Sequence, residues 1–234
     1  NLVDGFKIGA AFKNTMLFYG AGILVMFPLS ILASYFIHKK IVGYRFFRVI
    51  TYLPCIITSA ALVMLYRYLI DHGGLMHKIF QLTNPADAVY QAPLTDPSTA
   101  IWTILIYYVL TGLGTTIVVV GGAMNSLSPE MLEAGEIDGC NWFQELIYLV
   151  IPGIWPTLST IIILTTAGCL GSSGPILAFT KGAQETETLS YMMYHLTLKG
   201  RTSLYLPSAI GLIMTVITVP IVFTVRKLVT PNDE

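Results

Sequence analysis

Two long stretches without any charged side chain constrain this chain more than any other feature. Residues 97–129 and 146–180 contain no Asp, Glu, Lys or Arg. A helix that crosses the hydrocarbon core of a bilayer needs about 20 apolar residues, so each stretch is long enough for one crossing. Charged residues make up 11% of the 234 residues, whereas about 25% is usual in soluble domains. The sequence therefore predicts an integral membrane protein.

Apolar segments, prolines and charged clusters predict an all-α membrane protein with one domain, residues 1–234. Five membrane crossings are expected, at about residues 15–37, 51–70, 100–122, 154–176 and 206–225. The amphipathic residues 1–13 are expected to lie in the membrane interface. The polar stretch 71–99 is long enough to hold a short helix at Met76–Leu82. Gly112 and Gly114 in the third crossing permit close helix packing.

A dense basic cluster marks one side of the membrane as cytoplasmic. Its members follow the first crossing and are His38, Lys39, Lys40, Arg45 and Arg48. Short cytoplasmic loops carry an excess of Lys and Arg, so alternation places residues 123–153 and the C-terminal tail inside as well. Residues 123–153 contain no Lys or Arg. A loop without basic residues is not held at lipid headgroups, which indicates that it docks against a protein.

This acidic loop has its own helical pattern. Ser128 is a predicted N-cap with Pro129 at the first helical position, and Gly139 is a predicted stop with a positive φ. Three glutamates spaced three apart form a predicted acidic ridge, namely Glu130, Glu133 and Glu136. Small residues on the opposite face would let another backbone approach closely. Asn141 and Gln144 are a predicted capping pair for a second helix, which Pro152 kinks or ends.

The same loop resembles the "EAA loop" of permease subunits of bacterial ATP-driven importers. That family pattern is Glu-Ala-Ala, three residues, Gly, nine residues and Ile-x-Leu-Pro. Here Glu133-Ala134-Gly135 is followed after three residues by Gly139, and after nine more by Leu149-Val150-Ile151-Pro152. The third position is Gly rather than Ala. The Ile137-Asp138-Gly139 variant resembles the carbohydrate-importing (maltose-type, type I) branch of the ABC importers.

This resemblance implies a permease that translocates a sugar or oligosaccharide into the cytoplasm by alternating access. It implies that residues 123–153 form a cytoplasmic loop with a coupling helix. The residues implied to contact an ATPase are Glu133, Ala134, Gly135, Asp138, Gly139 and Pro152. The family core has six crossings, so the first is expected upstream of residue 1.

The resemblance also implies partners and a location. The expected partners are a second permease subunit in a heterodimer, two cytoplasmic ATP-binding subunits, and an extracellular or periplasmic solute-binding protein. The expected location is the bacterial cytoplasmic (inner) membrane, with several passes through the bilayer. A formal net charge of zero gives no reason to expect a nucleic-acid partner.

A translocation path is expected where the fourth crossing is interrupted late by Gly168, Gly171, Gly174 and Pro175. Broken backbone at membrane depth must face protein or a water-filled cavity. The candidate path residues are Ser172, Ser173, Gly174, Tyr107 and Tyr108. Aromatic faces suit sugar rings, but for Trp102, Tyr107 and Tyr108 core packing or a membrane-interface belt is the more common role. The family commonly has Phe-Asp where Ser173-Gly174 stands, so its substrate contacts do not transfer directly.

Catalytic and metal motifs are absent from the sequence. There is no GxxxxGK[ST] phosphate loop, HExxH, GxSxG or CxxC. We therefore expect no enzymatic activity and no cofactor in this chain, with ATP and Mg bound by the partner ATPase. No metal site is expected, because His72 and His77 lack helical ligand spacing. Arg67 has two open interpretations, as a side chain that reaches the interface or as a buried pair with Asp71.

An alternative interpretation is a self-contained membrane channel or secondary transporter, or a membrane-embedded enzyme. It treats residues 130–139 as a solvated loop helix, which explains the acidic ridge but not the small residues opposite it. Co-purification from native membrane distinguishes the two hypotheses, because only an importer permease brings an ATPase and a second permease with it.

Overall fold

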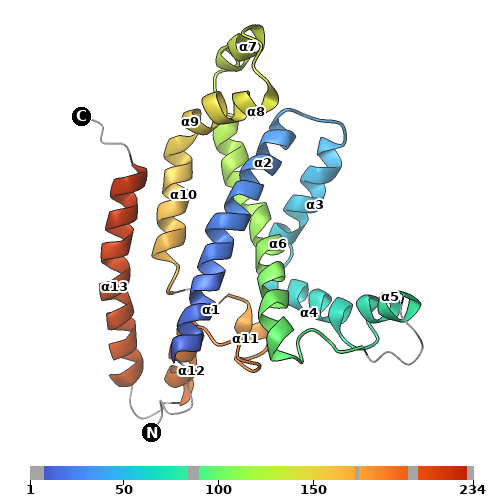
Figure 1. The fold of residues 1–234 in the computed structure, drawn as a ribbon, viewed down its shortest axis with the longest axis vertical. Helices are drawn as coiled ribbons and strands as arrows, with labels where there is room; N and C mark the ends of the chain where they lie inside the picture. The colour runs from blue at the N-terminus through green and yellow to red at the C-terminus, as the bar shows by residue number, and fades with distance from the viewer. Residues whose placement is uncertain (1–7, 84–89, 172–173, 200–204, 231–234) are drawn as a thin grey trace.

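The computed structural model describes residues 8–83, 90–171, 174–199 and 205–230. Regular secondary structure in these ranges is helical. Long helices run side by side along the longest axis, and shorter helices lie at both ends (Figure 1). The all-α fold expected from the sequence is therefore confirmed.

The first long helix is continuous from Ile8 to His38. It consists of α1 (Ile8–Gly20), a π-helical segment η1 (Ala21–Met26) and α2 (Phe27–His38). Pro28 lies directly after the π-helical segment. The wider π turn accommodates the missing N–H and the bulk of the proline ring, so the helix continues through it. Residues 8–13 belong to this helix rather than to a separate interfacial segment, and residues 1–7 lie outside the described residues.

The central helix is α6 (Pro97–Met124), which covers the predicted crossing at residues 100–122. Its N-cap is Asp96, whose carboxylate accepts a hydrogen bond from the Ser98 amide at 3.1 Å. The helix packs against α2 and against α3 (Tyr44–Ile56). A buried cluster joins it to α2 and to the later helices, and consists of Ile31, Tyr35, Val120, Met124, Leu146, Val150, Ile154 and Leu158.

The predicted crossing at residues 51–70 contains a break between two helices. α3 ends at Ile56 and α4 (Ser59–Ile70) follows, and the chain bends by 111° between Tyr44–Ile56 and Ser59–Thr83. The backbone of Ile57 and Thr58 is extended, which ends the helical ladder. Pro54 has no N–H to donate and so weakens the end of α3 just before the break. α5 (Leu75–Thr83) confirms the short helix predicted at 76–82.

The predicted crossing at residues 154–176 also has different bounds. The acidic loop contains α7 (Pro129–Ile137) and α8 (Trp142–Glu145), and the chain continues through η2 (Leu146–Val150) and α9 (Ile151–Gly153). A bend of 73° separates this segment from α10 (Trp155–Ala167). α10 ends at Ala167 with Gly168 as its C-cap, well before residue 176. A short helix, α11 (Ile176–Phe179), begins later, and the described residues between them, 168–171 and 174–175, are not helical.

The last two helices are α12 (Leu189–Lys199) and α13 (Tyr205–Val229). α13 covers the predicted crossing at residues 206–225. The Trp155 indole N–H donates a hydrogen bond to the carbonyl of Val229 at 2.9 Å. This bond ties the end of α13 to the beginning of α10.

Three helical stretches are long and apolar enough to cross a membrane, namely Ile8–His38, Pro97–Met124 and Pro207–Val229. The number rises to five if each bent pair counts as one span, so the five predicted crossings stay a prediction. The α2–α3 connection, α7, α8 and the end of α13 lie at one end, while α4, α5, α11 and α12 lie at the other (Figure 1). The arrangement agrees with the alternation of loops expected from the sequence.

We expect Gly114→Ala to weaken the packing of α3 on α6. A Cβ at this position would lie 2.3 Å from the carbonyl oxygen of Thr51 and 2.5 Å from the Cys55 sulfur. Overpacking of this kind costs about 1–3 kcal/mol. The measurement is thermal unfolding of the purified protein in detergent. Gly122→Ala is the control, because a Cβ there meets nothing within 4 Å. Equal stability of the two variants would contradict the close approach.

Candidate functional sites

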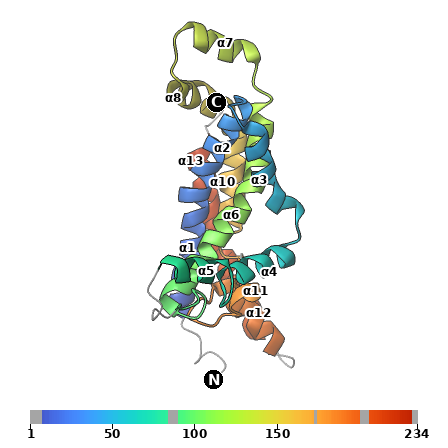
Figure 2. The same ribbon diagram turned by 90° about the vertical axis from the view of Figure 1, so that its right-hand side faces the viewer.

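The acidic loop projects beyond the long helices at one end of the molecule (Figure 2). The predicted caps of its two helices are present. The Ser128 hydroxyl accepts a hydrogen bond from the Met131 amide at 3.4 Å, with Pro129 in the first helical turn. The Asn141 amide donates to the side-chain oxygen of Gln144 at 2.9 Å. Local capping therefore fixes where α7 and α8 begin.

The turn between these helices depends on Gly139, whose φ is +77°. The predicted positive φ is thus confirmed. A Cβ at Gly139 would meet nothing within 4 Å, so the backbone conformation rather than space requires glycine here. The Cys140 amide donates to the carbonyl of Gly135 at 3.0 Å, which closes the end of α7.

The small-residue face is used partly within the chain itself. Gly135 is buried, and a Cβ there would lie 2.5 Å from a methyl carbon of Leu149. The contact with Leu149 already requires a small residue here, and the predicted contact of Gly135 with an ATPase stays a prediction. Ala134, Asp138 and Pro152 are exposed. Their predicted contacts with an ATPase stay predictions.

The three carboxylates of the acidic ridge, Glu130, Glu133 and Glu136, have different surroundings, because only Glu136 is paired with a cation among the described residues. The Lys39 ammonium lies 2.8 Å from a carboxylate oxygen of Glu136 and 2.9 Å from one of Glu145. Burial opposes the charge on Lys39, but its hydrogen bonds to Glu136 and Glu145 outweigh that effect and raise the pKa of Lys39. The hydrogen bond from Lys39 also lowers the pKa of Glu136.

Glu130 and Glu133 form the free part of the ridge. Both are exposed, and neither makes an ion pair in the part of the chain that the structure describes. Glu145 was not among the predicted functional residues, although its side chain is 4% exposed and paired. The sequence did contain a sign of this role, because Glu145 directly precedes the uncharged stretch 146–180. A carboxylate that is buried at the edge of such a stretch needs a cation beside it.

A second candidate site is a cavity of about 660 Å³ where α3 meets α4, beside the middle of α6. Three of the five predicted path residues line it, namely Tyr107, Tyr108 and Gly174. The other two, Ser172 and Ser173, lie outside the described residues. The volume is in the range of about 300–1,000 Å³ that is usual for small-molecule sites. The role of these residues in a translocation path stays a prediction.

The cavity lining is mostly apolar, with several uncharged polar groups among the described residues. Its hydroxyl and thiol groups come from Cys55, Ser59, Thr111, Thr115 and the two tyrosines, and no Asp, Glu, Lys or Arg lines it among the described residues. Tyr107 is largely buried, with its ring 4.8 Å from that of Phe179 and 5.2 Å from that of Tyr66. Tyr107 therefore serves core packing as well as the cavity wall.

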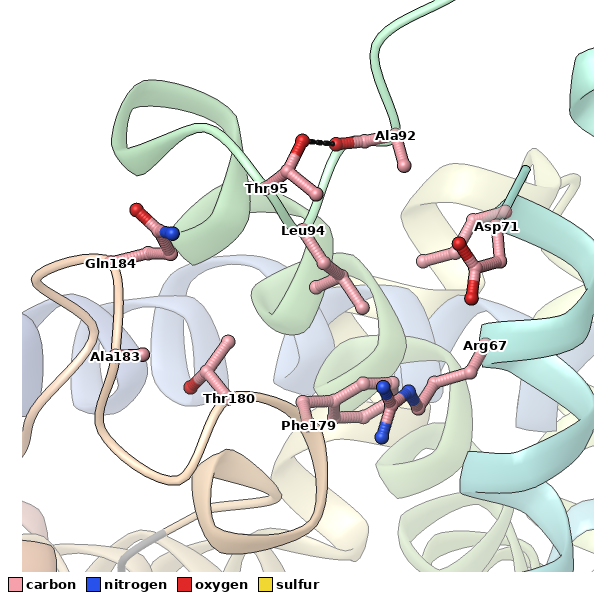
Figure 3. A pocket seen from close by; sticks show the side chains of 10 residues that line it. Arg67, Asp71, Ala92, Leu94, Thr95, Phe179, Thr180, Ala183 and Gln184 are labelled. Atoms are coloured by element: carbon pink, nitrogen blue, oxygen red, sulfur yellow. Dashed lines mark hydrogen bonds between the residues drawn. The ribbon is translucent and has the colours of Figure 1, made fainter.

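A smaller pocket of about 250 Å³ lies at the end of α4 (Figure 3). Arg67 and Asp71 line it from α4, opposite Thr180 and Gln184. No ion pair joins Arg67 to Asp71 in the described structure, which leaves the buried-pair interpretation without support. The Asp71 carboxylate instead accepts a hydrogen bond from the His72 amide at 2.8 Å.

The two histidines near this pocket are held by local contacts. His77 Nδ1 accepts a hydrogen bond from the Gly73 amide at 2.8 Å, and the His77 ring stacks on Tyr90 at 4.9 Å. Within the described ranges, no group of three or more His, Cys, Asp or Glu side chains is placed to hold a metal ion.

Comparison with known proteins identifies the family. Residues 26–232 match the family model described as "Binding-protein-dependent transport system inner membrane component". The chain belongs to this family. An inner-membrane location follows from the family together with the apolar helices.

Several relatives of this inner membrane component are named as permeases of sugar transport systems. The lactose transport system permease LacF of Rhizobium radiobacter is 25% identical over 197 residues, which cover 81% of this chain and 65% of that protein. The alpha-glucoside permease AglF of Rhizobium meliloti is 21% identical over 178 residues, covering 74% of this chain and 53% of that protein. The chain therefore spans less than two thirds of the length of these relatives.

A solved structure shares the fold of this inner membrane component. It is a bacterial ABC transporter that imports the acidic polysaccharide alginate, and one of its chains superposes with a TM-score of 0.84. The match covers 96% of this chain and 79% of that chain at 22% sequence identity. The likeness confirms an ABC importer permease fold.

We expect Gly139→Val to distort the turn between α7 and α8, because valine at positive φ costs about 1–3 kcal/mol. The measurement is the rate at which a glutamate-specific protease cuts the loop in the folded protein, which should rise. Gly139→Asn is the matched control, since asparagine tolerates positive φ far better. Equal cleavage rates for the valine and asparagine variants would contradict a conformational requirement at this position.

Proposed function

We propose that this chain is the transmembrane permease subunit of a binding-protein-dependent, ATP-driven importer that moves a sugar or oligosaccharide into the cytoplasm. The observation that carries the proposal is the projecting helix α7, which exposes Glu130 and Glu133 beyond the membrane helices. A partner that binds such a helix could move the membrane helices to which it is connected. Alternating access then requires only that the partner bind two arrangements of the helices with different affinity.

The energy source lies outside this chain in the proposal. The sequence has no phosphate-binding GxxxxGK[ST] loop, so ATP and Mg would bind to two separate cytoplasmic subunits. Glu133, Ala134, Asp138 and Pro152 are exposed on the projecting loop and would contact one of them. Gly135 and Gly139 would act indirectly, by fixing the shape of the loop. No cofactor is assigned to this chain itself.

The remaining partners would complete the substrate path. A second permease, in a heterodimer, would close the open side of the cavity, and an external binding protein would deliver the solute. The solved alginate transporter is known in complex with a periplasmic protein bound to an alginate pentasaccharide. That assembly supports the proposal by analogy of fold.

A neutral carbohydrate fits this chain better than an anion. Relatives are named for lactose and alpha-glucosides, and others for sn-glycerol 3-phosphate. The cavity wall offers hydroxyl groups and tyrosine rings but no cation among the described residues. Hydroxyls exchange hydrogen bonds with a sugar, and aromatic faces cover its C–H surface. A phosphate or uronate would lack a charge partner on this wall.

Reversal of the Glu133 charge tests the coupling role. Glu133→Lys removes a hydrogen-bond acceptor and places like charge against a basic groove, a loss of about 2–5 kcal/mol if the pair is buried in the complex. We expect insertion and pairing with the sister permease to persist, while the ATPase is lost or hydrolyses ATP without transport. The measurement is ATPase activity and vesicle uptake of the purified complex. Co-purification of the wild-type chain should bring an ATPase and a second permease.

Glu130→Lys is the control, because it reverses the same charge one helical turn earlier on an equally free residue. We expect it to be milder than Glu133→Lys. Wild-type assembly, stimulation and uptake in Glu133→Lys would contradict the coupling role of that residue. A wild-type chain that transports alone, without either partner, would favour a self-contained channel or secondary transporter.

The native Cys55 tests whether the cavity is on the path. Cys55 is exposed and lines the cavity, with its sulfur 3.6 Å from the Thr115 hydroxyl. In a variant whose other cysteines, Cys140 and Cys169, are serine, a charged thiol reagent should modify Cys55. The substrate should slow that reaction, and ATP should change its rate. Mass spectrometry of the labelled complex measures both effects.

Val216→Cys in the same background, with Cys55 also serine, is the control because it lies on an exposed apolar face of α13. Its labelling should not respond to the substrate. If Cys55 is inert in every state, or responds no more than residue 216, the cavity is not the path.

A further inference from the structure

One lysine joins the end of the first long helix to both halves of the acidic loop. Lys39 follows α2 directly as its C-cap residue. Its ammonium bonds Glu136 in α7 at 2.8 Å and Glu145 in α8 at 2.9 Å. Since Glu136 and Glu145 lie on opposite sides of the Gly139 turn, a single cation fixes the position of α7 relative to α8 and of both relative to α2.

The two carboxylates have different surroundings. The Glu145 side chain is 4% exposed, so Lys39 is the cation that compensates a carboxylate buried away from water. Tyr35, one turn before Lys39, also interacts electrostatically with Glu145. The Glu136 side chain is 65% exposed. Exposed pairs contribute little to stability, so the Glu136 contact determines position more than it holds the fold together.

The other basic residues of the same connection do not take part. Arg45 bonds the Tyr44 hydroxyl at 3.2 Å, and the Arg48 guanidinium lies 5.5 Å from the centre of the Tyr52 ring. Among the described residues, Lys39 is the only cation that pairs with the acidic loop. A second contact adds to it, since His38 Nδ1 lies 3.1 Å from the side-chain oxygen of Asn125, the C-cap residue of α6.

We propose that Lys39 is a positioning residue that transmits movement of α7 to α2 through Glu136, while Glu145 holds the lysine in place. The inference rests on the proposed coupling role of α7. The covalent connections of α7 lead to α6 and to α8, and α2 has no sequence connection to it. The Lys39–Glu136 bond is a direct mechanical link between α7 and the first long helix. The bond forms only when α7 has the position seen here, so it favours one of two arrangements of the helices.

The test is the amount of solute transported per ATP hydrolysed by the complete complex in vesicles. Glu136→Gln removes the charge of the exposed pair and leaves Lys39–Glu145 intact. We expect the complex to assemble with an unchanged unfolding temperature, while transport per ATP falls about two- to fivefold, the range that loss of an exposed ion pair allows. Lys39→Arg keeps the cation and should retain most of the coupling.

A second pair of variants distinguishes the positioning role of Lys39 from its contribution to the stability of the fold. Lys39→Met leaves Glu145 buried without a cation and should lower the unfolding temperature. Lys39→Met with Glu145→Gln removes the uncompensated charge and should recover the unfolding temperature. The double variant should remain deficient in transport per ATP, because the link to Glu136 is still missing.

A wild-type transport-to-ATP ratio in Glu136→Gln would overturn the inference, as would full recovery of that ratio in the double variant. Glu133→Lys distinguishes this failure from failure of the proposed function. If Glu133→Lys uncouples the complex and Glu136→Gln does not, α7 couples without Lys39. If both variants behave as wild type, the coupling role of α7 fails together with the inference.

Discussion

The structure depends on how a chain with few charges satisfies its backbone at membrane depth. Every N–H and C=O in hydrocarbon must be bonded within the protein, so helices are the default and each break needs a reason. Pro28 lies in the first turn after the π-helical segment η1, and the helix continues there. Pro152 lies in the first turn after η2, two residues before the 73° bend at Ile154. The break at residues 57–58 adjoins the cavity through Ile57, and Gly174 and Pro175 before α11 also line it. Part of the irregular backbone thus faces a cavity within the protein.

At the end of the molecule that carries the acidic loop, a few charged residues serve more than one purpose. The basic cluster after α2 is expected to set the orientation, yet one of its members, Lys39, also neutralises the buried Glu145. The acidic loop therefore needs no Lys or Arg of its own. Lys39 pairs with Glu136 and Glu145 and leaves Glu130 and Glu133 exposed and unpaired among the described residues. Two carboxylates therefore hold the loop in place, and two others remain open to a partner.

Local rules predicted the parts of the fold that depend on neighbouring residues. The Ser128 cap, the positive φ of Gly139 and the short helix α5 follow from a few adjacent positions. The bend between α3 and α4 was missed because the hydropathy of residues 51–70 is continuous across it. Lys39 and Glu145 are separated by more than a hundred residues, and no periodicity links them. The contact of Gly135 with Leu149 was missed for the same reason, since Leu149 approaches only after the Gly139 turn.

The acidic loop packs against the segment that leads into α10. Leu132 of α7 contacts the buried cluster that contains Val150, Ile154 and Leu158, and α10 begins at the 73° bend just after that segment. Farther along the chain, Gly174 and Pro175 line the cavity. Because packed interiors transmit displacement rather than absorb it, the proposed movement of α7 would be passed through this cluster to α10. The cluster thus supplies a physical connection between the projecting loop and the helix that precedes the proposed substrate path in the sequence.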